Sequence, residues 1–171
     1  GMFYNSNAES LDGIENFNTS NVTTMEDMFY STQTTILDVS GFDTSNVTTM
    51  EGMFTGISAS EIKGLDKFNT SNVTNMNGMF QVAANVEVLD VSSFDTSKVT
   101  TMESMFASCS KLKTIYASDK FVTTNAGGQS MFESSTSLEG GAGTKLSYTD
   151  KTYARIDGGT TKPGYFTAKP N

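Results

Sequence analysis

The amino-acid sequence predicts an α/β solenoid in which every coil contains one short parallel β-strand and one short helix. Three observations lead to this prediction. The sequence repeats itself with a period of about 26 residues. Each repeat contains a stretch in which apolar and polar residues alternate, as in a half-buried strand. A later stretch spaces its apolar residues as on one face of a helix.

The repeat is clearest in the methionine and phenylalanine residues. The dipeptide Met-Phe recurs at a nearly constant interval, and a second phenylalanine recurs with the same period. With one further methionine column, these positions hold all ten methionines and eleven of the twelve phenylalanines. We expect the core to contain Met25, Met50, Met76, Met102, Met28, Met53, Met79, Met105, Met131, Phe17, Phe42, Phe68, Phe94, Phe121, Phe29, Phe54, Phe80, Phe106 and Phe132.

The strand is predicted at residues 37–40 and 89–92, which both read Leu-Asp-Val-Ser. The alternation places leucine and valine on one buried face and the polar residues on the other. Gly41, Asp43 and Asn46 then provide residues that favour turns.

The helix is predicted immediately after that turn. Thr48 and Glu51 have the spacing of a capping box. Met50, Met53 and Phe54 follow at intervals of three and four residues, which predicts one apolar face of a helix of about two turns.

One strand and one helix cannot bury their apolar faces alone, whereas stacked coils can. We expect five to six coils in residues 1–143, the first of them truncated, and a β-rich C-terminal cap in residues 144–171 with a strand pair near Gly158 and Pro163. The chain opens in the middle of a repeat at Gly1, so we expect the native protein to continue upstream.

The repeat unit also resembles a known family. Residues 37–54 and 89–106 match L-D-x-S-x-F-D-T-S-x-V-T-x-M-x-x-M-F nearly throughout. This unit is similar to a branch of the BspA-like leucine-rich-repeat proteins of bacterial surfaces, and residues 152–167 are similar to the segment that often closes such arrays. The resemblance implies a leucine-rich-repeat-like solenoid on a secreted or surface-anchored protein, often one that mediates adhesion. It implies no catalytic residue and names no ligand.

Composition excludes several kinds of function. The formal net charge of −8 argues against nucleic acid and anionic membranes as partners. The absence of histidine rules out a Ser-His-Asp triad and a Cys-His pair. Cys109 is alone and cannot close an intrachain disulfide, which leaves a buried residue or a reactive thiol as interpretations. No apolar run approaches the roughly 20 residues of a membrane span.

The most prominent polar feature is a column of aspartates in the predicted strands: Asp12, Asp38, Asp66 and Asp90. Like charges that face each other on adjacent strands are destabilising, so a carboxylate column requires an explanation. Backbone amides, serine hydroxyls or water can solvate it. Alternatively, it forms a strip that attracts a basic protein, or a calcium site, although it lacks the loop of a dedicated calcium motif.

Other repeating polar residues have both structural and functional interpretations. The Thr-Ser pairs that begin at Thr19, Thr44, Thr70 and Thr96 either satisfy the backbone of the turns or form a carbohydrate-contacting edge. The methionine columns favour core packing over a soft-metal surface. Residues 140–145 are glycine-rich but lack the order of a phosphate loop, and we interpret them as a linker.

We therefore expect a non-catalytic, extracellular binding module that uses no cofactor or metal. Its partner would be a host or bacterial surface protein, such as a glycoprotein or mucin, contacted through the exposed solenoid face. Two alternatives remain: a passive spacer within a larger surface protein, and a carbohydrate-binding or carbohydrate-active module.

Overall fold

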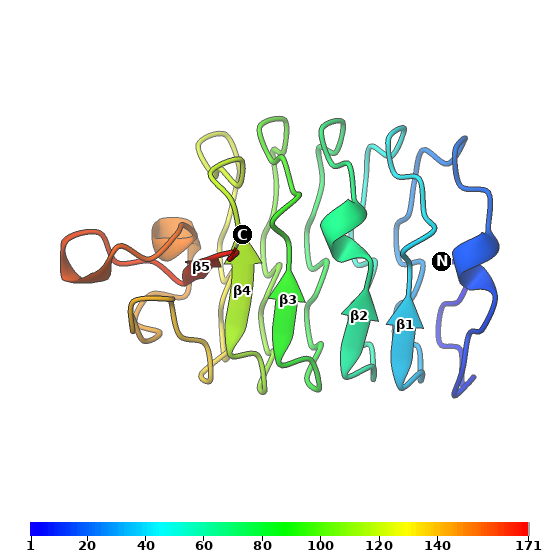
Figure 1. The fold of residues 1–171 in the computed structure, drawn as a ribbon, viewed down its shortest axis with the longest axis horizontal. Helices are drawn as coiled ribbons and strands as arrows, with labels where there is room; N and C mark the ends of the chain where they lie inside the picture. The colour runs from blue at the N-terminus through cyan, green and yellow to red at the C-terminus, as the bar shows by residue number, and fades with distance from the viewer. Residues whose placement is uncertain (171) are drawn as a thin grey trace.

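The computed structural model describes residues 1–170 as a row of coils whose strands lie side by side (Figure 1). The strands are β1 (Ile36–Asp38), β2 (Glu61–Lys63), β3 (Val88–Asp90), β4 (Thr114–Ala117) and β5 (Phe166–Ala168). β1 pairs with β2, and β3 pairs with β4, which pairs with β5; all three pairings are parallel. The strands from β1 to β4 follow one another by about one repeat, so equivalent residues of neighbouring coils meet.

A second parallel ladder joins the coils half a repeat away from the strands. It consists of parallel bridges between consecutive coils at Thr24, Thr49, Asn75, Thr101 and Gly127. Alternate backbone amides donate from one coil to the next along this ladder. The amides of Met50, Gly52, Phe54 and Gly56 bond to carbonyls of the following coil at 2.7–2.9 Å.

The helix expected to contain Met50, Met53 and Phe54 does not form. Residues 51–56 make consecutive turns, and the helices of the described residues are 3-10 helices of three residues each. They are η1 (Ile14–Asn16), η2 (Leu65–Lys67), η3 (Lys151–Tyr153) and η4 (Gly159–Thr161).

The hydrogen bonds between coils explain why the turn segment is not helical. Gly52 and Gly56 have φ angles of 61° and 65°, so the backbone becomes left-handed every fourth residue and an α-helix cannot continue. The alternate amides that bond to the next coil cannot bond within a helix. The Thr48 hydroxyl donates to the Thr23 carbonyl of the preceding coil at 3.1 Å and does not cap a helix.

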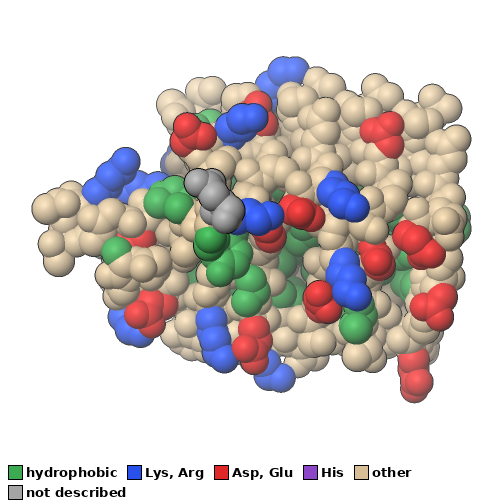
Figure 2. All heavy atoms as spheres, in the orientation of Figure 1, with side chains coloured by type: hydrophobic (Ala, Val, Ile, Leu, Met, Phe, Trp, Pro, Cys, Tyr) green, Lys and Arg blue, Asp and Glu red, His purple; other side chains and the backbone are tan. Residues whose placement is uncertain are grey.

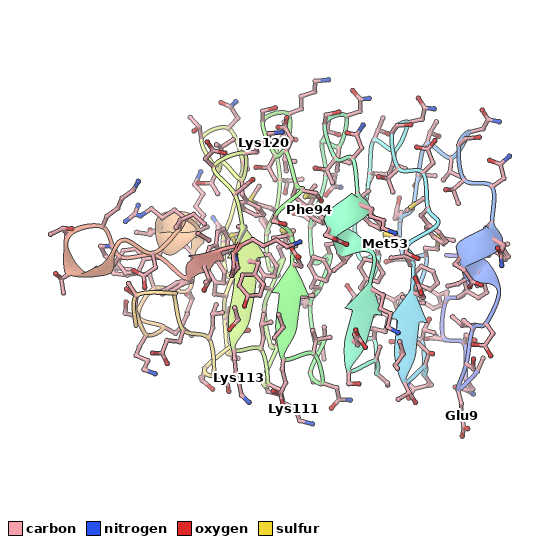
Figure 3. All side chains as sticks on the ribbon, viewed as in Figure 1. Glu9, Met53, Phe94, Lys111, Lys113 and Lys120 are labelled. Atoms are coloured by element: carbon pink, nitrogen blue, oxygen red, sulfur yellow. The ribbon has the colours of Figure 1, made fainter. Side chains whose placement is uncertain are left out.

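The methionine and phenylalanine columns lie between the two ladders. Met25, Met50, Met76 and Met102 are at most 1 % exposed. Rings one repeat apart stack on each other, with centroid distances of 5.8, 5.4, 5.7 and 5.7 Å along the series Phe29, Phe54, Phe80, Phe106 and Phe132. Met53 and Phe94 point into this interior (Figure 3).

Two expected core residues are less buried than the other residues of their columns. Phe17 is 38 % exposed and Met28 is half-buried. Phe17 lies in the first coil and contacts Phe3 with a centroid distance of 6.2 Å. The corresponding ring in a later coil, Phe94, has further coils on both sides and is buried.

The C-terminal segment covers the last coil, with Asn171 outside the described residues. Its strand β5 extends the coil sheet by pairing with β4, whereas the strand pair expected near Gly158 and Pro163 is replaced by η4 and its flanking loop. Tyr165 and Phe166 are fully buried, and their rings meet Phe132 edge-on at 5.1 and 6.1 Å. These aromatic contacts close the apolar interior at this end.

Candidate functional site

The outer face of the strands carries the side chains that the core does not use. Leu37 and Leu89 point inward and are buried. Their neighbours Ile36 and Val88 point outward and are 46 % and 51 % exposed. We name this outer surface of β1 to β4 the strand face. Figure 2 shows it as a mixture of acidic, basic and apolar side chains.

Asp38 is held on the strand face by local hydrogen bonds. Its carboxylate accepts the backbone amide of Ser40 at 2.9 Å. The hydrogen bonds from Ser40 are the main cause that lowers the pKa of Asp38, and Lys63 and Lys67 lower it further. Asp38 is paired in the strand register with Lys63, so a basic residue lies beside it on the next coil.

Asp66 and Asp90 share one lysine from the C-terminal cap. The Lys169 ammonium lies 2.6 Å from the Asp90 carboxylate and 3.7 Å from that of Asp66. Burial alone would raise the pKa of Asp90, but hydrogen bonds from Lys169 and Ser92 outweigh it and the pKa is lowered. The same contact with Asp90 raises the pKa of Lys169.

The four aspartates therefore do not form one continuous column. Asp66 lies in η2, three residues beyond the strand position that Lys63 occupies, and Asp12 lies in a turn before η1. Gly64 allows this displacement, because its φ is 89° and a Cβ there would lie 2.3 Å from the Ser40 Cα of the preceding coil. The chain thus bends closely over its neighbour at η2.

Sequence reasoning missed the lysines that balance these carboxylates. Lys63 had a detectable signal, because Ile62 stands one repeat after Leu37 and Lys63 therefore takes the position of Asp38. Lys169 had none, since it lies outside the repeat and reaches Asp90 through the fold of the cap.

Three open hollows follow the strand face and its lower edge. The first, of about 610 Å³, lies between the first coil and β1, and Asp12, Ile36 and Asp38 help to line it. The second, of about 710 Å³, crosses the middle coils beside Val88. The third, of about 660 Å³, lies between β4 and the cap, beside Tyr116. The labelled side chains of Glu9, Lys111 and Lys113 project from the lower edge of the coils (Figure 3).

The threonine columns are turned inward. The hydroxyls of Thr19, Thr44 and Thr70 each accept a backbone amide and donate to the carbonyl of the same residue in the next coil. All three threonines, and Thr96 with them, are at most 4 % exposed. Their hydroxyls hold neighbouring turns together and do not line the surface.

The remaining candidate features are the single cysteine, possible metal ligands and possible membrane-spanning helices. Cys109 is fully buried, its thiol lies 3.0 Å from the Phe80 carbonyl, and burial raises its pKa to about 11. Within residues 1–170, no three His, Cys, Asp or Glu side chains are grouped so that they could hold a metal ion. No helix in the same residues has the length and apolar character required to cross a membrane.

Comparison with known proteins gives one match. No curated protein and no solved structure is significantly similar to the chain. The model of one family matches residues 1–61 and again residues 35–144, which together include all the coils and most of the chain. The chain therefore belongs to the family described as Mycoplasma protein of unknown function, DUF285.

Proposed function

We propose that the chain is a non-catalytic binding module, a solenoid of the BspA-like leucine-rich-repeat type, which contacts a protein partner at the bacterial surface. The family model matches the chain twice in overlapping stretches, as a repeat array would, which supports the solenoid part of this proposal. The repeat unit of residues 37–54 supports the finer relationship to the BspA-like branch.

One observation carries the proposal. Polar groups between the coils are used to hold the stack together, as the buried hydroxyl of Thr70 illustrates. On the strand face, by contrast, Ile36 and Val88 remain about half exposed beside open hollows. An apolar surface with a polar rim is a feature of sites that bind proteins, and these two side chains, two coils apart, supply apolar contacts within the polar strand face.

The carbohydrate alternative receives less support. The threonine hydroxyls of the Thr-Ser pairs are buried between coils at Thr19, Thr44, Thr70 and Thr96. The serine hydroxyls remain partly exposed, and those of Ser20, Ser45 and Ser71 donate to the side chains of Asn18, Asp43 and Asn69. Asp66 and Asp90 also share Lys169, so neither is free to act in the carboxylate pair that glycoside hydrolysis requires.

The spacer alternative rests on a different observation. The backbone ladder through Thr24, Thr49, Asn75, Thr101 and Gly127 crosses five consecutive coils without interruption. Such a continuous ladder makes a stiff rod, which could hold another domain away from a cell surface.

A binding assay separates these functions. We expect the purified chain to bind at least one member of an immobilised panel of collagen, fibronectin and mucin. The substitution Val88→Arg would place a charge on the strand face and weaken that binding about tenfold or more. Val122→Arg is the matched control, because Val122 is an exposed valine outside the strand face.

The outcomes are distinct. Equal loss of binding in both variants would contradict the strand face as the contact surface. No binding of the unmodified chain to any member of the panel would contradict the binding function and favour the spacer. Release of reducing sugar from a polysaccharide panel would instead favour the carbohydrate-active alternative.

A further inference from the structure

The hollow between the first coil and β1 combines an apolar wall with carboxylates. Ile36 is 46 % exposed there, and Asp12 and Asp38 belong to the same lining. Glu9 and Glu15 also line the hollow, and Lys63 is its one basic lining residue.

The charge around this hollow is strongly asymmetric. The sequence contains no Lys or Arg before Lys63, whereas Asp and Glu recur throughout that part of the chain. Figure 2 shows only acidic charged side chains at the N-terminal end of the strand face. Lys63 and Lys67 lower the pKa of Asp38, but none of the ion pairs found within residues 1–170 involves a carboxylate of the hollow. Asp66 and Asp90, by contrast, share Lys169. A cationic partner is therefore complementary to this end of the face.

The hollow is a groove between two neighbouring coils. β1 pairs with β2 on one side, and the first coil lies on the other side, where the Thr35 amide donates to the Glu9 carbonyl at 3.3 Å. A partner would therefore contact the side chains that line the groove. No aromatic ring lines the hollow, so it lacks the flat platform on which a sugar ring stacks.

We infer that this hollow binds a protein segment that carries lysine or arginine beside aliphatic residues. The aliphatic side chains contact Ile36, and the cationic side chains lie against Asp12 and Asp38. This inference rests on the proposed binding function and specifies the partner and the part of the strand face that it contacts.

A synthetic peptide tests the inference directly. The probe is a short fluorescent peptide that alternates lysine with valine, and its binding to the full 171-residue chain is measured by fluorescence anisotropy. We expect binding that weakens about fivefold or more when the ionic strength is raised from low to high salt, because salt screens exposed charges. A peptide with glutamate in place of lysine should not bind.

A matched pair of double variants locates the site. Asp12→Asn with Asp38→Asn should weaken binding of the lysine peptide about threefold to tenfold, since each exposed charge pair contributes modestly to affinity. Asp43→Asn with Asp95→Asn makes the same change in net charge away from the hollow and should change binding less than about twofold. Asn keeps the oxygen that Asp38 and Asp43 each use to accept a serine amide, so both variants preserve the local turns.

Several results would overturn the inference. Equal weakening by the two double variants would show a general charge effect, and salt-independent binding would show that the cationic side chains do not matter. Binding to the matrix panel that depends on Val88 but not on Asp12 and Asp38 would leave the proposed function intact and refute this site. Failure of the chain to bind both panel and peptide would refute the proposed function itself.

Discussion

The Thr70 hydroxyl forms two hydrogen bonds with the backbone of Asp95 in the next coil. It accepts the Asp95 amide at 2.8 Å and donates to the Asp95 carbonyl at 2.9 Å. Thr70 is 1 % exposed, so water cannot replace either bond. The Thr70 side chain therefore satisfies both the amide and the carbonyl of Asp95, which lies outside the two parallel ladders.

The substitution Thr70→Val should destabilise the protein by about 1–3 kcal/mol, because it keeps the shape and leaves buried backbone groups unpaired. The change in the free energy of unfolding can be measured by urea denaturation. Thr74→Val in the same coil is the control, since the Thr74 hydroxyl is exposed and makes a single bond of 3.2 Å to the Thr48 carbonyl. Equal destabilisation by the two substitutions would show that the hydrogen bonds between Thr70 and Asp95 contribute no special stability.

The stacked phenylalanines predict a larger effect. Phe80 lies between Phe54 and Phe106, with centroid distances of 5.4 and 5.7 Å, and is fully buried. Phe80→Ala should destabilise the chain by about 3–5 kcal/mol through lost burial and a cavity. Phe17→Ala in the first coil should have a clearly smaller effect, because that ring is 38 % exposed. Thermal denaturation, monitored by circular dichroism, shows which of the two variants is less stable.

The sequence was most informative where the same side chain recurs at one phase of the repeat. A parallel stack places equivalent residues next to each other, so the period alone is enough to predict that Phe54 and Phe80 are neighbours. The depth of burial at the first coil could not be predicted in this way, because the period does not specify how Phe17 is covered.

The sequence was misleading about the turn segment. Met50, Met53 and Phe54 have helical spacing, but one residue in four there is left-handed and alternate amides bond to the next coil. Serine, aspartate and glycine occupy these left-handed positions in different coils, as in Asp27, Gly52 and Ser104, so no single residue type marks them. The contact between Lys169 and Asp90 was equally beyond prediction, because it depends on how the cap folds back.

Val82 is a strained exception among these left-handed residues. Its φ is 58°, it is β-branched, and its side chain is 45 % exposed and so gains little from packing. The equivalent residue of the preceding coil is Gly56, with a φ of 65°. We expect Val82→Gly to stabilise the chain by up to about 1 kcal/mol, since glycine adopts this conformation without steric strain.

The control for Val82 is an exposed valine in ordinary extended backbone. Val88→Gly in β3 should destabilise the chain by about 0.5–1 kcal/mol, because glycine loses more conformational freedom on folding. Changes of opposite sign in the urea midpoint of the two variants would agree with strain at Val82. Destabilisation by both substitutions would show that the Val82 side chain makes a contribution that exceeds the strain.

The cap is organised around Asp157, and this residue should make stability depend on pH. Its carboxylate accepts the amides of Ala142, Thr144 and Gly159 at 2.9–3.0 Å and the Thr144 hydroxyl at 2.8 Å. Burial alone would raise the pKa of Asp157, but these hydrogen bonds outweigh it and lower the pKa to about 2. The unfolded chain has the ordinary value of 3.8, so folding favours the ionised form.

The stabilisation by ionised Asp157 is therefore present above about pH 4 and is lost as the pH falls towards about 2. Asp157→Asn should destabilise the chain by about 1 kcal/mol at pH 6, after allowance for solvent screening, and by less at pH 3. Asp119→Asn is the control, because Asp119 is exposed and lies outside the cap. Urea denaturation at both pH values measures the effect, and a constant difference between the original chain and Asp157→Asn would mean that shape, rather than charge, sets the contribution of this carboxylate.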